Sequence, residues 1–235
     1  MKTISKKRVA LWTLALFVSA CSASVVSFYP LYTKDTLVEF DEIIGEWDIT
    51  DGDGDTYNPD DHGEEPYIYV SINKNTDKKN LYTFTLNVVP DPHQMTPCEI
   101  ESLKCDTITN TCYMEKYKVG FVKINGMHYA DFYPLEKAGE QGYNLVDNAE
   151  MKSHAFSKMY FNSDTLFLEW FSQKWLLRLI QQNKIRIRHE VRSQDSLVML
   201  TAKPEELQKF IRKYGEDPKA FDGVPESLEM VPRKR

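Results

Sequence analysis

Short segments of alternating apolar and polar residues recur along the chain, which predicts a mainly β protein. Six segments show this alternation: 67–72, 81–88, 113–124, 127–133, 152–161 and 165–171. Turn residues separate most of them, and Asn125-Gly126 is a strong signal for a two-residue hairpin. We therefore expect about nine strands in successive hairpins, an antiparallel up-and-down meander that closes or nearly closes into a barrel.

Two later segments repeat their apolar residues with a helical period. Ser172 is placed to cap one helix, and Pro204 and Gly215 mark the start and stop of a second. The apolar faces contain Trp175, Leu176, Leu179 and Ile180 in the first helix and Leu207, Phe210, Ile211 and Tyr214 in the second. Residues 184–191 alternate strictly and residues 196–201 are apolar, so both are predicted as strands. The sequence thus predicts one inserted helix and one C-terminal helix, followed by a polar tail at residues 223–235 that is loose from Val231 onward.

An apolar run at residues 43–49 predicts the first strand and contains Gly45 and Trp47. Glycine lets another backbone pass close by, and an indole can plug the end of a closed sheet while its N–H donates to a carbonyl. The spacing resembles the Gly-x-Trp signature that opens the barrel of the lipocalin superfamily. The alternative is an ordinary core Trp in an antiparallel sheet. The resemblance implies a lipocalin-like barrel over residues 42–222.

The first twenty residues have the pattern of a signal peptide. Lys2, Lys6, Lys7 and Arg8 precede an apolar run from Val9 to Ala20 that is too short to span a membrane. The run ends in Val18-Ser19-Ala20-Cys21, which resembles the lipobox of bacterial lipoproteins. The resemblance implies cleavage after Ala20 and lipidation of Cys21. A soluble secreted protein with a cysteine near its cleavage site is the alternative.

We expect residues 21–41 to form a tether between the lipid and the domain. Ser22 rather than Asp after the cysteine resembles cargo sent to the outer membrane, and the chain has no acidic run after Cys21. These features imply an outer-membrane, periplasm-facing location. The membrane is then one partner, held through the N-terminal lipid.

Several segments of the mature chain resemble a group of uncharacterised bacterial lipoproteins with a lipocalin-like domain. They are Tyr29-Pro30-Leu31-Tyr32-Thr33, Ile44-Gly45-Glu46-Trp47, Ala130-Asp131-Phe132-Tyr133-Pro134, His154-Ala155-Phe156, and Leu200-Thr201-Ala202 running into residues 206–210. The resemblance implies shape and location but no catalytic residue. Lipocalins also place a late arginine across the Trp, and Arg186, Arg188 and Arg192 are the candidates.

The charge balance argues against nucleic acid as a partner. The whole chain carries 29 basic and 35 acidic residues, and the four basic residues of the leader leave 25 against 35, a net charge of −10. Lys184, Arg186 and Arg188 form a cationic stripe opposite Ile185 and Ile187. This stripe is either a solvated strand face or a contact for an anionic lipid headgroup or a partner.

Three cysteines lie close together at Cys98, Cys105 and Cys112, and an oxidising compartment permits disulfides. A disulfide between Cys105 and Cys112 is favoured because residues 106–111 read as a hairpin turn. Cys98 paired with either residue is the alternative. A zinc site with His93 lacks the usual short cysteine spacing, and residues 51–65 only begin like a calcium loop. We therefore predict no metal and no cofactor.

The chain lacks the familiar catalytic motifs, so an enzyme is not expected and no catalytic residue is assigned. His128 and His154 are expected in strands and to meet inside the sheet beside Asp131 or Asp164, as hydrogen-bonded structural residues. Two functions follow from the barrel. One is a module that binds a small apolar molecule or lipid inside. The other is a structural or interaction lipoprotein whose barrel is filled and which acts through its loops.

Overall fold

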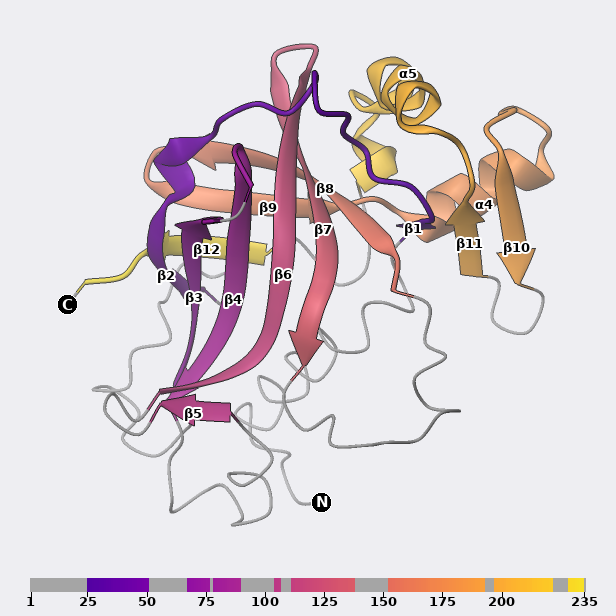
Figure 1. The fold of residues 1–235 in the computed structure, drawn as a ribbon. Helices are drawn as coiled ribbons and strands as arrows, with labels where there is room; N and C mark the ends of the chain where they lie inside the picture. The colour runs from indigo at the N-terminus through magenta and orange to yellow at the C-terminus, as the bar shows by residue number, and fades with distance from the viewer. Residues whose placement is uncertain are drawn as a thin grey trace, which may run out of the picture.

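The computed structural model describes residues 25–50, 67–76, 78–89, 104–106, 111–137, 152–192, 197–221 and 228–234. The predicted signal peptide, Cys21, the acidic segment 51–65 and Cys98 lie outside these residues. Within them the protein is a closed antiparallel barrel with two helices beside it (Figure 1). The mainly β prediction with a lipocalin-like barrel is confirmed.

The barrel has eight strands, which follow one another around the sheet in chain order. They are β2 (Gly45–Ile49), β3 (Tyr67–Lys74), β4 (Leu81–Val89), β6 (Thr111–Ile124), β7 (Met127–Lys137), β8 (His154–Asn162), β9 (Thr165–Trp170) and β12 (Leu228–Pro232). Every neighbouring pair is antiparallel, and β12 closes the ring between β9 and β2. A short strand, β5 (Lys104–Asp106), pairs with β6 outside the ring.

The predicted polar tail at residues 223–235, loose from Val231 onward, is wrong where β12 forms. Met230 lies opposite Ile49 on one side and Leu166 on the other, and Met230 is fully buried. Leu228 and Met230 alternate with Glu229 and Val231, which is the strand period. Without β12, strands β2 and β9 would be unpaired edges.

A long excursion separates β9 from β12 and lies beside the barrel. It contains α4 (Gln173–Gln181), β10 (His189–Arg192), β11 (Leu197–Leu200), α5 (Pro204–Tyr214) and a 3-10 turn, η4 (Pro218–Phe221). The Ser172 hydroxyl accepts the Trp175 N–H at 3.3 Å, so the predicted cap is confirmed. The strand predicted over residues 184–191 is confirmed only from His189, because residues 184–188 form no strand.

The predicted tether at residues 21–41 is wrong from Val25 onward, because this segment is part of the fold. Strand β1 (Val26–Ser27) pairs in parallel with β11 and antiparallel with β8. A 3-10 turn, η2 (Asp41–Ile43), then leads into β2. Figure 1 shows the segment running from β1 over one end of the barrel to β2.

Two glycine positions explain local backbone turns. Asn125 and Gly126 both have positive φ, at 51° and 81°, as the predicted hairpin requires. Gly45 has a φ of 150°, which side chains rarely allow, and an added Cβ would meet only the Trp47 indole nitrogen, at 3.9 Å. Backbone conformation, rather than a second backbone passing nearby, therefore accounts for glycine at position 45.

Buried apolar side chains form two cores. The barrel core fills the ring with side chains that point inward, including Trp47, Phe84, Phe121, Phe132 and Met159. The outer core lies between the outside of β6, β7 and β8 and the excursion, and includes Leu31, Phe156, Phe171, Trp175 and Phe210. Strands β6, β7 and β8 therefore contribute to both cores.

Candidate functional site

One end of the barrel is closed around Trp47. The side chain of Trp47 is buried, and its indole N–H donates to the Ile43 carbonyl at 2.8 Å, as the sequence predicted. Phe40 lies over the same end, where its ring contacts Phe121 edge-on at 5.4 Å and stacks on His128 at 4.0 Å. Burial lowers the pKa of His128. This end of the barrel is therefore plugged by residues 40–47.

Aromatic contacts continue along the inside of the barrel. Phe132 contacts Phe84 at 5.3 Å and Trp170 at 5.1 Å, and Tyr117 packs against Phe84 at 6.4 Å between ring centres. An eight-stranded barrel is about wide enough for side chains alone to fill it. These contacts place side chains, rather than an open channel, along the described length of the barrel.

Two inward positions away from the Trp47 end are polar. Glu115 lies opposite Leu86 in the sheet, is 6% exposed and accepts a hydrogen bond from the Tyr117 hydroxyl. Ser157 is fully buried opposite Trp170, and its hydroxyl has no hydrogen-bond partner among the described residues. A buried polar atom costs free energy unless it is paired. Apolar packing does not account for either of these residues.

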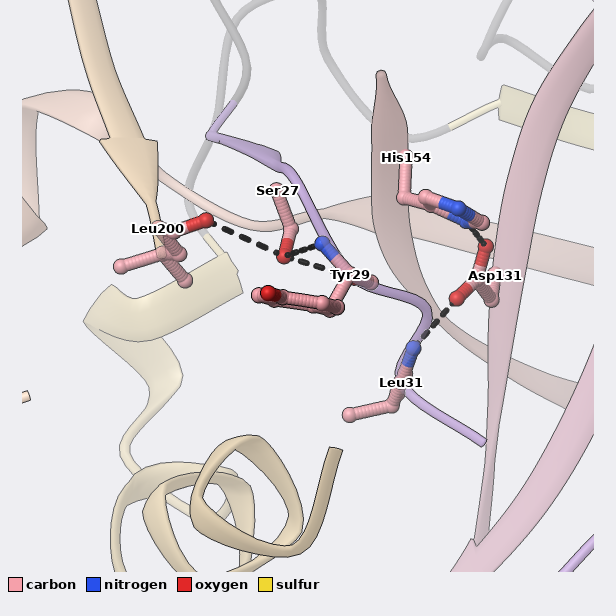
Figure 2. Close-up of polar contacts among 6 residues, drawn as sticks. All are labelled: Ser27, Tyr29, Leu31, Asp131, His154 and Leu200. Atoms are coloured by element: carbon pink, nitrogen blue, oxygen red, sulfur yellow. Dashed lines mark hydrogen bonds and ion pairs between the residues drawn. The ribbon is translucent and has the colours of Figure 1, made fainter. Parts of the chain in front are cut away.

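A second polar cluster joins the N-terminal segment to the outside of the barrel (Figure 2). Asp131 on β7 is 1% exposed, and one of its oxygens lies 2.6 Å from His154 Nδ1 on β8. Its other oxygen accepts the Leu31 backbone N–H at 2.5 Å. Gln208 on α5 donates to the Leu31 carbonyl at 2.9 Å. We call Asp131, His154, Leu31 and Gln208 the N-terminal clasp.

Burial sets the electrostatics of the clasp. It raises the pKa of Asp131, while the hydrogen bonds from His154 and Leu31 oppose that rise. Burial, and then the charge of Asp131, raise the pKa of Tyr32 to about 12. Gly120, opposite Asp131 on β6, leaves room for this ring, because an added Cβ would lie 2.5 Å from Tyr32 Cε1. The clasp is thus a fitted contact between barrel and N-terminal segment.

Ser27, His154 and Asp131 are the residue types of a hydrolytic triad and lie close together. The hydrogen bond from serine to histidine that a triad needs is not formed. Ser27 is the register partner of His154, but its hydroxyl contacts the Tyr29 carbonyl at 2.7 Å and the Leu200 carbonyl at 3.4 Å (Figure 2). A nucleophile must be within reach of the histidine that deprotonates it. His154 therefore meets Asp131, as the sequence suggested, in a buried structural pair, whereas His128 lies apart at the Trp47 end.

A surface cavity of about 410 Å³ lies beside β2. It is lined by Gly45, Glu46, Ser71, Asn73 and Arg233. The Arg233 guanidinium lies 3.9 Å from the centre of the Tyr69 ring, and its nitrogens lie 3.5 Å from Glu46 and 3.7 Å from Asp48. The charged groups at the cavity therefore already contact one another.

Arg233 is an arginine whose backbone lies beside the Trp47 strand, and a late arginine across the Trp47 ring stays a prediction. Its backbone N–H donates to the Glu46 carbonyl at 2.9 Å, next to the pairing of Pro232 with Trp47. Arg188, one of the candidates, instead pairs with Glu206 on α5. The sequence reading missed Arg233 because it placed this residue in a loose tail.

The predicted cysteine pair lies in register. Cys105 on β5 is directly opposite Cys112 on β6, and Cys112 is fully buried. Directly opposite residues of antiparallel strands have Cα atoms about 4.5–5.5 Å apart, within the range that a disulfide spans. The side chain of Cys105 and the whole of Cys98 lie outside the described residues. The pairing of Cys105 with Cys112 remains a prediction, which the register supports.

Among the described residues, His, Cys, Asp and Glu form no group of three that could hold a metal ion. No described helix combines the length and apolar character needed to cross a membrane. A scan against models of known protein families finds no match, and comparisons with curated proteins and with solved structures find none either.

Proposed function

We propose that the protein is a lipid-anchored protein of the bacterial cell envelope, with a lipocalin-like barrel that is filled by its own side chains and acts through its outer surfaces. Cys21 carries the lipid, and the domain faces the periplasm from the outer membrane. The lipobox residues Val18-Ser19-Ala20-Cys21 support the anchor. Gly45 and Trp47 support a lipocalin-like barrel. The resemblance to uncharacterised outer-membrane lipoproteins supports the location in the cell envelope.

The packing of the barrel core is the observation that favours a filled barrel over a ligand carrier. Phe40, Phe121 and Trp47 close one end, and Phe84, Phe132 and Trp170 lie along the interior. A carrier of drug-sized molecules needs a cavity of about 300–1,000 Å³. The cavity described above lies on the surface and is lined by polar and charged residues. Function then lies on the outside of the domain.

A small apolar molecule or lipid bound inside is the second candidate, and one observation favours it. Glu115 and Ser157 are buried polar residues that face inward at the end opposite Trp47. Ligand sites combine apolar walls with a few polar groups that fix orientation. A ligand entering from that end would meet Tyr117 and Trp170 as walls and these two side chains as its polar contacts.

Native mass spectrometry distinguishes the two candidates. The chain from Ser22 onward is exported to a bacterial periplasm, purified without detergent, and weighed before and after denaturing extraction. We expect the bare chain mass lowered by two hydrogens for one disulfide. A discrete extra mass that is lost on denaturation would contradict the filled barrel and identify the class of ligand.

The lipid anchor is tested separately with the full chain in cells. We expect Cys21→Ala to remove the protein from the membrane fraction while the domain keeps its thermal unfolding midpoint, because Cys21 precedes all residues of the fold described above. The wild-type chain and a Ser22→Ala variant serve as controls. A Cys21→Ala chain that stays fully membrane-bound in alkaline carbonate would contradict lipidation.

A further inference from the structure

The fold begins only a few residues after Cys21. Val25 is fully buried in the outer core, and β1 starts at Val26. Four peptide units separate the Cα atoms of Cys21 and Val25, so the two lie at most about 14 Å apart even when extended. If Cys21 carries a lipid, as proposed above, the side of the domain around β1 is held close to the bilayer.

Exposed apolar side chains gather on this side. Four large hydrophobic residues are exposed among the described residues, and two of them directly follow β1: Phe28 at 53% and Tyr29 at 38%. The Phe28 N–H donates to the Leu200 carbonyl at 2.9 Å, so the Phe28 backbone continues the pairing of β1 with β11. These two strands and β10 form one end of the sheet. Aromatic residues are favoured at the membrane–water interface. Phe28 and Tyr29 contact each other, with ring centroids 5.1 Å apart, so two exposed aromatic rings lie together at this place.

The excursion differs in charge from the rest of the mature chain. Residues 171–227 contain 11 basic and 8 acidic residues, a balance of +3, whereas the remainder carries 14 basic and 27 acidic residues, a balance of −13. The basic excursion and β1 lie on one side of the barrel, away from the C-terminus (Figure 1). Anionic phospholipid attracts such a surface and repels the rest of the domain.

One end of the cationic stripe, at Arg188, lies near the exposed aromatic residues. Ile185 is buried and Ile187 packs on the outer core, while Lys184, Arg186 and Arg188 are exposed. The Thr201 N–H donates to the Arg188 carbonyl at 3.0 Å, and Thr201 follows Leu200, the partner of Phe28. Arg188 pairs with Glu206, which leaves Lys184 and Arg186 as the positions to test.

We propose that Phe28, Tyr29, Lys184 and Arg186 form a membrane-docking face that lies on a bilayer containing anionic phospholipid. The aromatic side chains enter the interface, and the two cations contact lipid phosphates. Docking orients the barrel so that the end of β1 faces the lipid. The lipid on Cys21 supplies attachment, and this face supplies orientation. The orientation rests on the proposed anchor, but the affinity of the face for lipid is its own property.

The test uses the mature chain from Ser22, which has every residue of the described fold and no lipid. Its sedimentation is measured with vesicles of 30% phosphatidylglycerol and 70% phosphatidylethanolamine, and with phosphatidylcholine alone. We expect binding to the anionic vesicles that weakens at least tenfold between 50 and 500 mM NaCl, because salt screens the headgroup charge. Binding to phosphatidylcholine is expected to be at least tenfold weaker.

Two variants and two matched controls assign the binding to this face. Lys184→Glu with Arg186→Glu is expected to weaken binding at least tenfold, since each cation near an anionic surface contributes about fivefold. Phe28→Ala is expected to weaken it about fivefold. Lys78→Glu with Lys79→Glu alters an exposed turn of the barrel, and Ile44→Ala removes another of the four exposed apolar residues. Both controls should bind as the wild type does.

Because all substituted residues are exposed, unchanged unfolding midpoints are expected and are measured first. Absence of binding by the wild type, or equal losses in the controls, would overturn the docking face. Binding to another protein instead, seen as co-purification without affinity for vesicles, also overturns it. Since the chain carries no lipid, these results are independent of Cys21. A failure of lipidation appears only in the cell fractionation described above.

Discussion

The barrel core and the outer core have similar compositions but are assembled in different ways. Seven of the eight barrel strands are consecutive hairpin partners, so the side chains of the barrel core come mostly from neighbouring segments. The outer core joins Val25 and Leu31 to Phe171, Phe210 and other residues of the excursion. The barrel is thus built from local pairings, and the outer core depends on contacts between distant segments.

The strand β12 is the point where the barrel itself depends on a distant contact, and the largest effect is expected there. Met230→Asp places a charge in the barrel core where Met230 is fully buried. An unpaired buried charge costs more than about 4 kcal/mol, enough to abolish cooperative folding of many domains. We expect loss of the thermal transition measured by circular dichroism.

Glu229→Gln in the same strand provides the matched control. Glu229 is half-buried and lies between two inward-facing residues of β12. Its substitution should change the unfolding free energy by less than about 0.5 kcal/mol, as is usual for surface changes. If Met230→Asp unfolds at the wild-type temperature, β12 does not close the barrel in solution.

The two cores can be compared directly with Phe121→Ala and Phe171→Ala. Both rings are fully buried, one among Phe40 and Tyr82 in the barrel and the other among Trp175, Phe210 and Phe221 outside it. Each substitution is expected to cost about 3–5 kcal/mol in urea unfolding. Because β6, β7 and β8 serve both cores, we expect one transition for each variant. A second transition in Phe171→Ala alone would make the outer core a separate folding unit.

The same division explains what the sequence predicted. Alternation and turn residues mark the hairpins, and the Asn125-Gly126 turn, the Ser172 cap and the Gly45–Trp47 end of the barrel follow from local rules. Residues 25–41 are predicted as a tether because their apolar residues have no period. Their place is set by Asp131 and Gln208, which are 100 and 177 residues away from Leu31. Contacts between residues so far apart in the chain cannot be predicted from a local sequence pattern.

The polar features were harder to predict than the apolar ones. Alternation predicts that residues 113–124 form a strand, and continuing it from Phe121 and Val119 puts Glu115 on the inward face opposite Leu86. A charged residue is not expected at such a position from the apolar pattern alone. Likewise, Asp131 and His154 were expected to be near each other, whereas the role of their pair in holding Leu31 depends on the tertiary fold.

The N-terminal clasp offers a smaller test of the distant contacts. Asp131→Ala leaves the Leu31 N–H and His154 without their acceptor, and a buried hydrogen-bonding group left unpaired costs about 1–3 kcal/mol. Asp131→Asn keeps an oxygen for Leu31 and has nearly the same shape. We therefore expect the alanine variant to lose about 2–4 kcal/mol in urea unfolding at pH 7, with a smaller change for the asparagine variant.

The pH dependence of that comparison follows from the pKa of Asp131. Burial raises the pKa of Asp131 in the folded protein above its ordinary value of 3.8. At pH values between the ordinary pKa and the raised pKa, the folded protein therefore binds more protons than the unfolded chain does. The unfolding free energy therefore falls as pH rises through this interval. Asp131→Asn has no such carboxyl group, so the stability of the wild type relative to this variant should decline from pH 4 upward. A relative stability that rises with pH would mean that His154 and Leu31 outweigh burial, and that the clasp is held by the charge of Asp131.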